Sequence, residues 1–198
     1  MKKNLTAVVL AGGNSARTNK PKLFLSYSER MTFIEKIIKA YFNLGCKKII
    51  IVLNKKFSEN AVIKKLEDSY NIKVTINEHQ ERGRFYSLSL GLAEADEKSY
   101  LFIQNADNPF ISVLLLKKMY NKRNIERYVI PVYNDKSGHP VLIGEKIIRR
   151  LKEEKNINSN LRDILHEFNK IGIPVKSENV LANINTMADY RKYFINNK

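Results

Sequence analysis

Apolar and polar residues follow one another in blocks along the chain, and each block has a recognisable period. Short continuous apolar runs predict strands that are buried on both faces, at residues 6–11, 48–54, 72–77, 100–106, 128–133 and 139–144. Apolar residues at helical spacing predict helices at 33–44, 62–70, 85–92, 115–119 and 161–168. We expect Gly45 and Gly172 to end the first and last of these helices, and Ser58 to cap the second.

The alternation of strands and helices predicts an α/β fold, a three-layer α/β/α sandwich with a mainly parallel sheet, in one domain over residues 1–198. In such folds, ligands bind outside the carboxyl ends of the strands. The candidate segments are therefore those that follow or adjoin a strand end, at 12–25, 77–87, 104–110, 134–141 and 183–189.

Charge and composition narrow the classes of partner. The formal charge is +15, from 35 basic and 20 acidic side chains, which favours polyanionic partners. Because the lysines are spread along the whole chain, phosphorylated small molecules fit better than nucleic acid. The single cysteine, Cys46, excludes an intramolecular disulfide and a zinc cluster and predicts a structural thiol. We expect no membrane span, because no apolar run is long enough, and a cytoplasmic location.

The run LAGGNSARTNKPK follows the first predicted strand. Gly12 and Gly13 let the backbone approach a ligand and point its N–H groups at an anion. Ser15 adds a hydroxyl donor, and Arg17 and Lys22 add two cations. The run matches neither of the two common phosphate-binding fingerprints, so a basic surface turn stays the alternative.

A carboxylate follows the fourth predicted strand. Asp107 stands before Asn-Pro at the carboxyl edge of the sheet, where it suits Mg²⁺, which takes one or two carboxylates together with phosphate oxygens. The alternative is a turn residue ahead of a helix that starts near Ser112.

The segment after the third predicted strand offers polar groups for a nucleotide. Asn77 ends that strand, Gly83 gives a flexible entry, and Ser87 lies in the first turns of a helix, where its hydroxyl could bond a nucleobase. The alternative for Ser87 is a hydrogen bond to its own backbone.

Two further segments carry candidates for the acceptor and the metal. His139, between Gly138 and Pro140, is pinned on a turn and could bind a phosphate or a ring of the acceptor, or face solvent. Asn185, at the end of a possible strand over 183–185, could ligate a cation, although a cap by Thr186 on a final helix is the default reading of that segment.

In order and spacing, these segments resemble the molybdenum cofactor nucleotidyltransferase family, within the NTP transferase superfamily that also holds sugar-nucleotide pyrophosphorylases. Leu10 to Lys22 match the pattern L-A-(A/G)-G-x-S-x-R-M-G-x-x-K except at Thr18 and Asn19. DNP matches the family's D-x-P metal turn, and SGHPVLIG resembles the G-H-P-V-L-F segment of the cytidylyltransferase branch. NINTMADY resembles D-I-D-T-P-E-D-Y, with Asn185 in place of a second acidic ligand.

The resemblance implies a Rossmann-like nucleotide-diphospho-sugar transferase fold of the GT-A type. It also implies Mg²⁺-dependent transfer of a nucleoside monophosphate from an NTP to molybdopterin, with release of pyrophosphate. The G-H-P-V-L segment favours CTP as the donor, whereas the Ala-Gly-Gly loop favours GTP. A sugar or polyol phosphate is the alternative acceptor, and a non-catalytic nucleotide-binding accessory protein is the alternative role. A molybdoenzyme or its chaperone would be the partner protein.

The resemblance also assigns roles to residues. Arg17 and Lys22 would be catalytic, and Asp107 and Asn185 would bind magnesium. Gly138, His139 and Pro140 would contact the acceptor. The implied nucleotide-binding residues are Leu10, Ala11, Gly12, Gly13, Ser15, Arg17, Lys22, Asn77, Gly83, Ser87 and Asp107.

Overall fold

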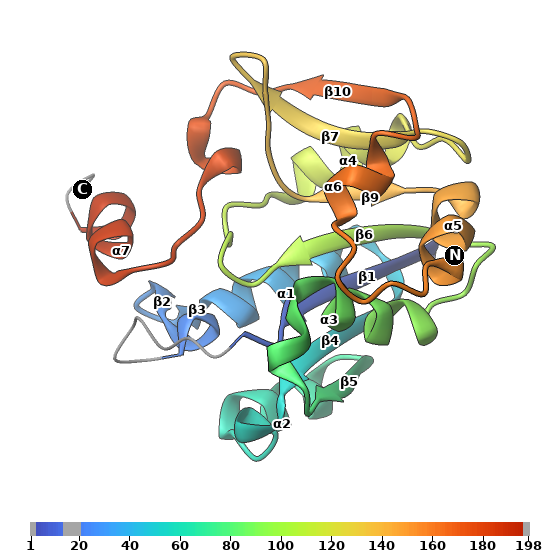
Figure 1. Ribbon diagram of the computed structural model, residues 1–198. Coiled ribbons are helices and arrows are strands. Elements are labelled where there is room, and N and C mark those ends of the chain that lie inside the picture. The colour runs from blue at the N-terminus through green and yellow to red at the C-terminus, as the bar shows by residue number, and fades with distance from the viewer. Residues whose placement is uncertain (1–2, 14–20, 196–198) are drawn as a thin grey trace.

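A mixed eight-stranded sheet forms the centre of the computed structural model, which describes residues 3–13 and 21–195 (Figure 1). Its strands are β1 (Lys3–Ala11), β4 (Cys46–Asn54), β5 (Ile72–Asn77), β6 (Tyr100–Asn105), β7 (Tyr128–Tyr133), β8 (Lys136–Ser137), β9 (Val141–Ile143) and β10 (Lys170–Pro174). The order is β10-β7-β9-β6-β1-β4-β5, with β8 paired to β7. Only the pairings of β9 and β8 are antiparallel, so the expected mainly parallel sheet is confirmed among the described residues.

Helices cover both faces of the sheet. The cluster on one face includes α1 (Phe33–Leu44), α2 (Ala61–Ser69) and α4 (Val113–Asn121). The cluster on the other face includes α3 (Gly83–Ala93), α5 (Glu145–Glu153) and α6 (Leu161–Leu165). This arrangement confirms the three-layer α/β/α sandwich. Within the part of the chain that the structure describes, no helix has the length and apolarity to cross a membrane.

A smaller unit stands at one end of the sheet. The hairpin of β2 (Ser26–Ser28) and β3 (Met31–Thr32) contacts the last helix, α7 (Met187–Phe194), through aromatic side chains. Four short 3-10 helices, η1 (Lys22–Phe24), η2 (Lys55–Phe57), η3 (Gln80–Arg82) and η4 (Glu178–Leu181), connect the other elements.

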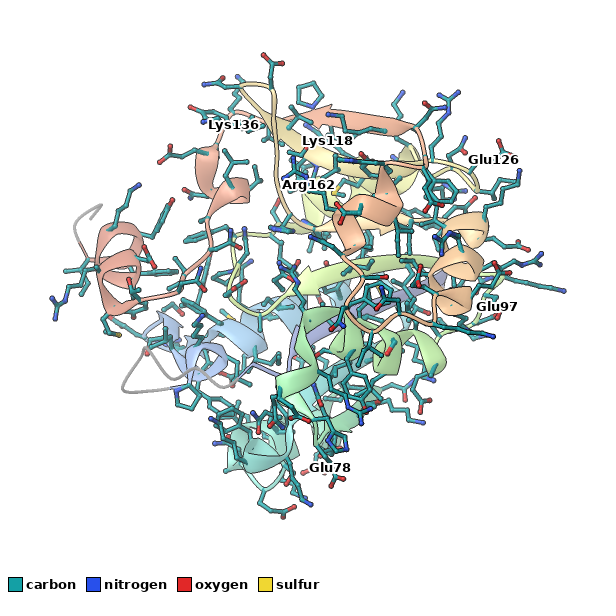
Figure 2. The ribbon with its side chains drawn as sticks, in the orientation of Figure 1. Glu78, Glu97, Lys118, Glu126, Lys136 and Arg162 are labelled. Carbon is teal, nitrogen blue, oxygen red and sulfur yellow. The ribbon has the colours of Figure 1, made fainter. Side chains whose placement is uncertain are left out.

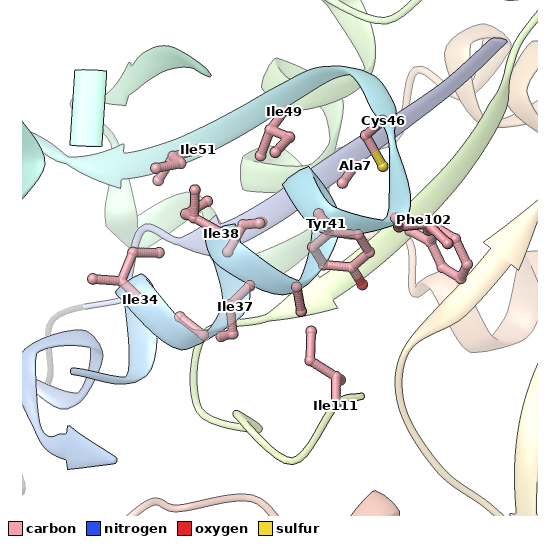
Figure 3. Close-up of a cluster of buried hydrophobic side chains, with 14 of the residues drawn as sticks. Ala7, Ile34, Ile37, Ile38, Tyr41, Cys46, Ile49, Ile51, Phe102 and Ile111 are labelled. Carbon is pink, nitrogen blue, oxygen red and sulfur yellow. The ribbon is translucent and has the colours of Figure 1, made fainter. Parts of the chain in front are cut away.

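The core explains why the strand sequences are continuously apolar. Val9 of β1 packs with the α1 layer, whereas its neighbour Val8 packs with the α3 layer. Figure 3 shows the first of these clusters, with Tyr41 and Phe102 in ring contact at 5.4 Å between centroids. Cys46 lies in the same cluster as a buried thiol that forms no disulfide among the described residues, in agreement with the expected structural role.

Local sequence signals set most helix ends correctly. Gly45 ends α1 in the left-handed conformation, at φ 89°, and Thr186 caps α7 together with Asp189 in a capping box. Both expectations are confirmed. The expected N-cap at Ser58 is wrong, because the side chain of Asn60 accepts the hydrogen bond from the Val62 N–H instead.

Three other expectations are corrected. Gly172 does not end a helix, because α6 already stops at Leu165 and Gly172 lies inside β10. Residues 183–185 form an irregular connection between η4 and α7 and not a strand end. The predicted strand over 139–144 is shorter, because β9 covers only Val141–Ile143 and His139 lies before it.

Candidate active site

A cavity of about 440 Å³ lies at the carboxyl ends of β1 and β6. Most of the expected nucleotide-binding residues line it, namely Leu10, Ala11, Gly12, Gly13, Lys22, Gly83, Ser87 and Asp107. Asn185 lines the same cavity, as do Leu23, Gln80, Arg84, Asn105 and Ala106, for which the sequence had suggested no role. Ser15 and Arg17 lie outside the described residues.

The backbone of Gly12 passes close to a pair of polar side chains. A Cβ at this position would stand 3.0 Å from Ser87 Oγ and 3.2 Å from Asn77 Nδ2. Asn77 Nδ2 donates a hydrogen bond to Ser87 Oγ at 2.9 Å, and Asn77 Oδ1 accepts one from the His79 N–H at 2.8 Å. Asn77 therefore does not line the cavity; it orients Ser87, which does.

Three polar residues from distant parts of the sequence, Lys22, Asp107 and Asn185, line this cavity together. Lys22 Nζ donates a hydrogen bond to Asn185 Oδ1 at 2.6 Å, across 163 residues of sequence. The backbone carbonyl of Asp107 accepts a hydrogen bond from the Ile184 N–H at 2.9 Å, which ties the β6 loop to the segment before α7. The predicted cation and the two predicted metal ligands thus belong to one site.

The carboxylate of Asp107 is in an unusual environment. Its Oδ1 atom is buried and has no hydrogen-bond partner among the described residues. Burial raises the pKa of Asp107 above its ordinary value, while the nearby charges of Arg84 and Lys22 oppose part of that rise. A buried carboxylate oxygen without a partner is costly unless a ligand completes it.

The residues present fit a magnesium ion. Mg²⁺ in phosphate-binding sites takes one or two carboxylates and completes its shell with water and phosphate oxygens. Asp107 offers the unpartnered carboxylate oxygen, and Asn185 offers an amide oxygen on the same cavity. No three His, Cys, Asp or Glu residues of the described ranges come together as a metal cage, so most ligands would have to come from the substrate.

A buried asparagine holds the segment that carries Asn185. The side-chain amide of Asn108 donates to the carbonyls of Val180 at 3.1 Å and Ala182 at 2.6 Å, with a longer bond to Asn179 at 3.4 Å. Its own carbonyl accepts from the Phe110 N–H at 3.2 Å. Asn108 therefore fixes the chain ahead of Asn185 onto the loop that carries Asp107.

A second cavity, of about 820 Å³, adjoins the first. Leu10 and Arg84 line both cavities. Of the expected acceptor residues, Gly138 and His139 line the second cavity, whereas Pro140 is buried in the chain next to them. A Cβ at Gly138 would stand 2.6 Å from the Val180 carbonyl oxygen, so the turn must carry glycine here.

A chain of hydrogen bonds runs from Arg84 to His139 at the junction of the two cavities. Arg84 Nη2 donates to Asn105 Oδ1, and Asn105 Nδ2 lies 3.4 Å from His139 Nε2. A guanidinium can only donate, so the Asn105 carbonyl must face Arg84 and its amide must donate to His139. His139 Nε2 is therefore the acceptor, and the ring carries its proton on Nδ1.

The same environment keeps His139 neutral. Burial, followed by the positive charge of Arg84, lowers the pKa of His139 from 6.5 to about 4. At neutral pH the ring is a fixed hydrogen-bond donor and carries no charge. The cation at the junction is Arg84, whose role could have been noticed because it directly follows Gly83 in a candidate segment.

The cavity thus lies where open α/β sheets bind their ligands, outside the carboxyl ends of the strands. The chain belongs to the MobA-like NTP transferase domain family, because a model of that family matches residues 7–171. The resemblance found in the sequence is thereby confirmed.

The chain is also similar in sequence to two named proteins and in fold to a third. It is 31% identical over 215 residues to a probable molybdenum cofactor guanylyltransferase of Natranaerobius thermophilus, across 98% of each chain. It is 29% identical over 168 residues to the bifunctional enzyme IspD/IspF of Pelagibacter ubique, across 84% of this chain but only 43% of that protein. A nucleotidyl transferase from Methanothermobacter has the same fold, with a TM-score of 0.77 and 24% identity over 95% of this chain and 94% of the other.

Proposed function

We propose that this protein transfers a nucleoside monophosphate from an NTP to a phosphorylated small molecule and releases pyrophosphate. CTP is the first candidate donor and GTP the second, and the first candidate acceptor is a molybdopterin-type phosphate. The observation that carries the proposal is the pair of adjoining cavities, with Lys22 and Asp107 on the first and His139 on the second. Arg84 lines both.

The chemistry requires positioning and charge neutralisation more than proton transfer. The acceptor phosphate attacks the α-phosphorus of the NTP while pyrophosphate leaves, and the attacking oxygen is already anionic, so no general base is needed. In this proposal the N–H groups of Gly12 and Gly13 hold the triphosphate, and Lys22 neutralises charge on the α-phosphate and the leaving group. Arg17 would share that task.

On the acceptor side, Arg84 and His139 would bind the attacking phosphate. Arg84 supplies a permanent positive charge at the junction, and His139 supplies a neutral Nδ1–H donor held in place by Asn105. A bound Mg²⁺ on Asp107 and Asn185 would add positive charge to the phosphate oxygens. Its loss should abolish turnover, because Lys22 and Arg84 alone leave much of the triphosphate charge unbalanced.

A sugar or polyol phosphate is the second candidate acceptor. The match to the bifunctional IspD/IspF protein shows that the similarity is not confined to relatives named for the molybdenum cofactor, so we keep this second acceptor class. The guanylyltransferase relative, in turn, supports GTP as the donor. Both nucleotides and both acceptor classes therefore belong in the test.

The first test is a thermal-shift panel of CTP, GTP, ATP and UTP with Mg²⁺. A nucleotide at about 100 times its dissociation constant should add ~2.7 kcal/mol to the free energy of unfolding. No shift with any nucleotide would refute both the enzyme and the accessory-protein readings.

The second test measures pyrophosphate release with the preferred nucleotide and either molybdopterin or a sugar phosphate. Lys22→Ala should abolish release without unfolding the protein. Lys118→Ala, on α4 and away from both cavities, is the charge-matched control and should keep the wild-type rate. Wild-type turnover in Lys22→Ala would contradict the role given to Lys22, and nucleotide binding without any release would favour the accessory protein.

A further inference from the structure

The second cavity is too large for a phosphate group alone. Its volume of about 820 Å³ lies in the range of sites that enclose a whole small molecule, ~300–1,000 Å³. Apolar side chains also line it, among them Phe85, Leu88 and Leu165. The acceptor that fits it therefore has a body beyond the phosphate that reacts.

Basic side chains line this cavity at more than one place. Arg84 stands at the junction with the first cavity, while Arg162, His166 and Lys170 line another part, from α6 and the start of β10. We call these last three residues the distal subsite. Figure 2 shows Arg162 on α6 and Lys136, a further lining cation, on the β7–β8 hairpin.

The strand register gives the spacing between the two parts. The Gly138 N–H donates to the Pro131 carbonyl, so the His139 turn lies beside the second half of β7. Lys170 pairs with Tyr128, the first residue of β7. Three residues of strand separate these positions along β7, about 10 Å at ~3.3 Å per residue. Because β10 and β9 flank β7 on opposite sides, the two positions are also two strand spacings apart, roughly 10 Å across the sheet.

The ion pairs formed among the described residues leave out the distal subsite. Within the described ranges, neither Arg162 nor Lys170 forms an ion pair, and the nearby Glu167 is bound by Arg150 at 2.8 Å. Asp135 is the single acidic residue among those that line the cavity. It lies beyond the opposite end of β7, next to Lys136, which pairs with Tyr133.

We propose that the acceptor carries a second anionic group, and that Arg162 and Lys170 bind it in a part of the cavity away from the phosphate that reacts. This inference rests on the proposed function, because it takes the second cavity as the acceptor's site. It narrows the acceptor class to phosphorylated molecules with an apolar or hydrogen-bonding body and an anion at the far end.

The test compares two probes by calorimetric titration at one ionic strength. Hexanediol bisphosphate carries a phosphate at each end of its chain, and hexyl phosphate carries only one. The wild-type protein should bind the bisphosphate at least about tenfold more tightly, as one added charge-assisted contact allows. Equal affinities, after the statistical factor of roughly two for identical ends, would overturn the proposal.

The double variant Arg162→Gln, Lys170→Gln should lose this preference while it keeps the wild-type affinity for hexyl phosphate. The control is Lys118→Gln, Lys122→Gln, which removes the same charge from the α4 side of the sheet and should keep the preference. An equal loss in the control would show general charge attraction and refute the subsite.

Nucleotide thermal shifts on the same samples separate the two proposals. If CTP and GTP bind but the double variant behaves as wild type, the distal subsite is wrong and the proposed function stands. If no nucleotide binds while the bisphosphate preference persists and depends on Arg162 and Lys170, the anion subsite stands and the proposed function is wrong.

Discussion

Replacing His139 with glutamine should remove part of the acid sensitivity of the fold. The pKa of His139 is about 4 in the folded protein, against 6.5 as its ordinary value. Below pH 6.5, His139 is therefore protonated in the unfolded chain but stays neutral in the folded protein. The free energy of unfolding falls as the pH falls. The contribution is fully present above the unfolded pKa and is lost as the pH falls towards the folded one.

The size of this change in the free energy of unfolding follows from the pKa shift of His139. Between pH 6.5 and about pH 5 the linkage amounts to ~1.36 kcal/mol per pH unit, or roughly 2 kcal/mol in total. His139→Gln cannot titrate, and its amide oxygen can still accept the hydrogen bond from Asn105. The variant should therefore lose about 2 kcal/mol less than the wild type over this interval.

Urea unfolding, followed by far-ultraviolet circular dichroism at both pH values, measures this difference. Other titrating groups, such as Asp107, are present in both proteins, so their contributions cancel when the two pH dependences are subtracted. Parallel losses of stability in wild type and variant would refute the buried, neutral state assigned to His139.

Three further substitutions test the packing and the site. Gly91→Ala should cost about 2 kcal/mol in urea unfolding, because its Cβ would lie 2.5 Å from Val8 Cγ1; an unchanged midpoint would contradict that contact. Asn108→Ala should cost about 3 kcal/mol, since the Ala182 carbonyl loses the bond at 2.6 Å; a loss under 1 kcal/mol would show that its carbonyl partners find other donors. Gly12→Ala should weaken nucleotide binding about tenfold in titration calorimetry, because its methyl group crowds Ser87; wild-type affinity would remove Gly12 from the site.

The sequence predicted the positions of the strands well, and the central strands β1, β4 and β6 are continuously apolar because both of their faces are buried. The predicted runs 72–77 and 128–133 coincide with β5 and β7. The apolar pattern does not indicate the direction of a strand. Nothing in the apolar run at 139–144 indicated that β9 is antiparallel to β6. α5 was missed although Ile147, Ile148 and Leu151 have helical spacing, because its other residues are mostly charged.

The candidate site was predictable where a motif places backbone and charge next to each other in the sequence. Gly12, Lys22 and Asp107 were found in this way, and they do line one cavity. Arg84 and Asn105 were not, because their importance comes from contacts made across the junction of two cavities. Hydrogen bonds such as those of Asn108 depend on the fold itself and have no local signature.

The antiparallel direction of β9 sets which part of the chain lines the second cavity. In a parallel strand, the residues at the carboxyl edge of the sheet are those that follow the strand. Because β9 runs antiparallel to β6, the residues that lie at this edge are those that precede β9. The hairpin from Asn134 to Gly138 therefore reaches the second cavity from outside the βα loops that line the first cavity. Under the proposed function, residues could be inserted in that hairpin to suit a different acceptor while the Gly12 and Asp107 loops keep their lengths.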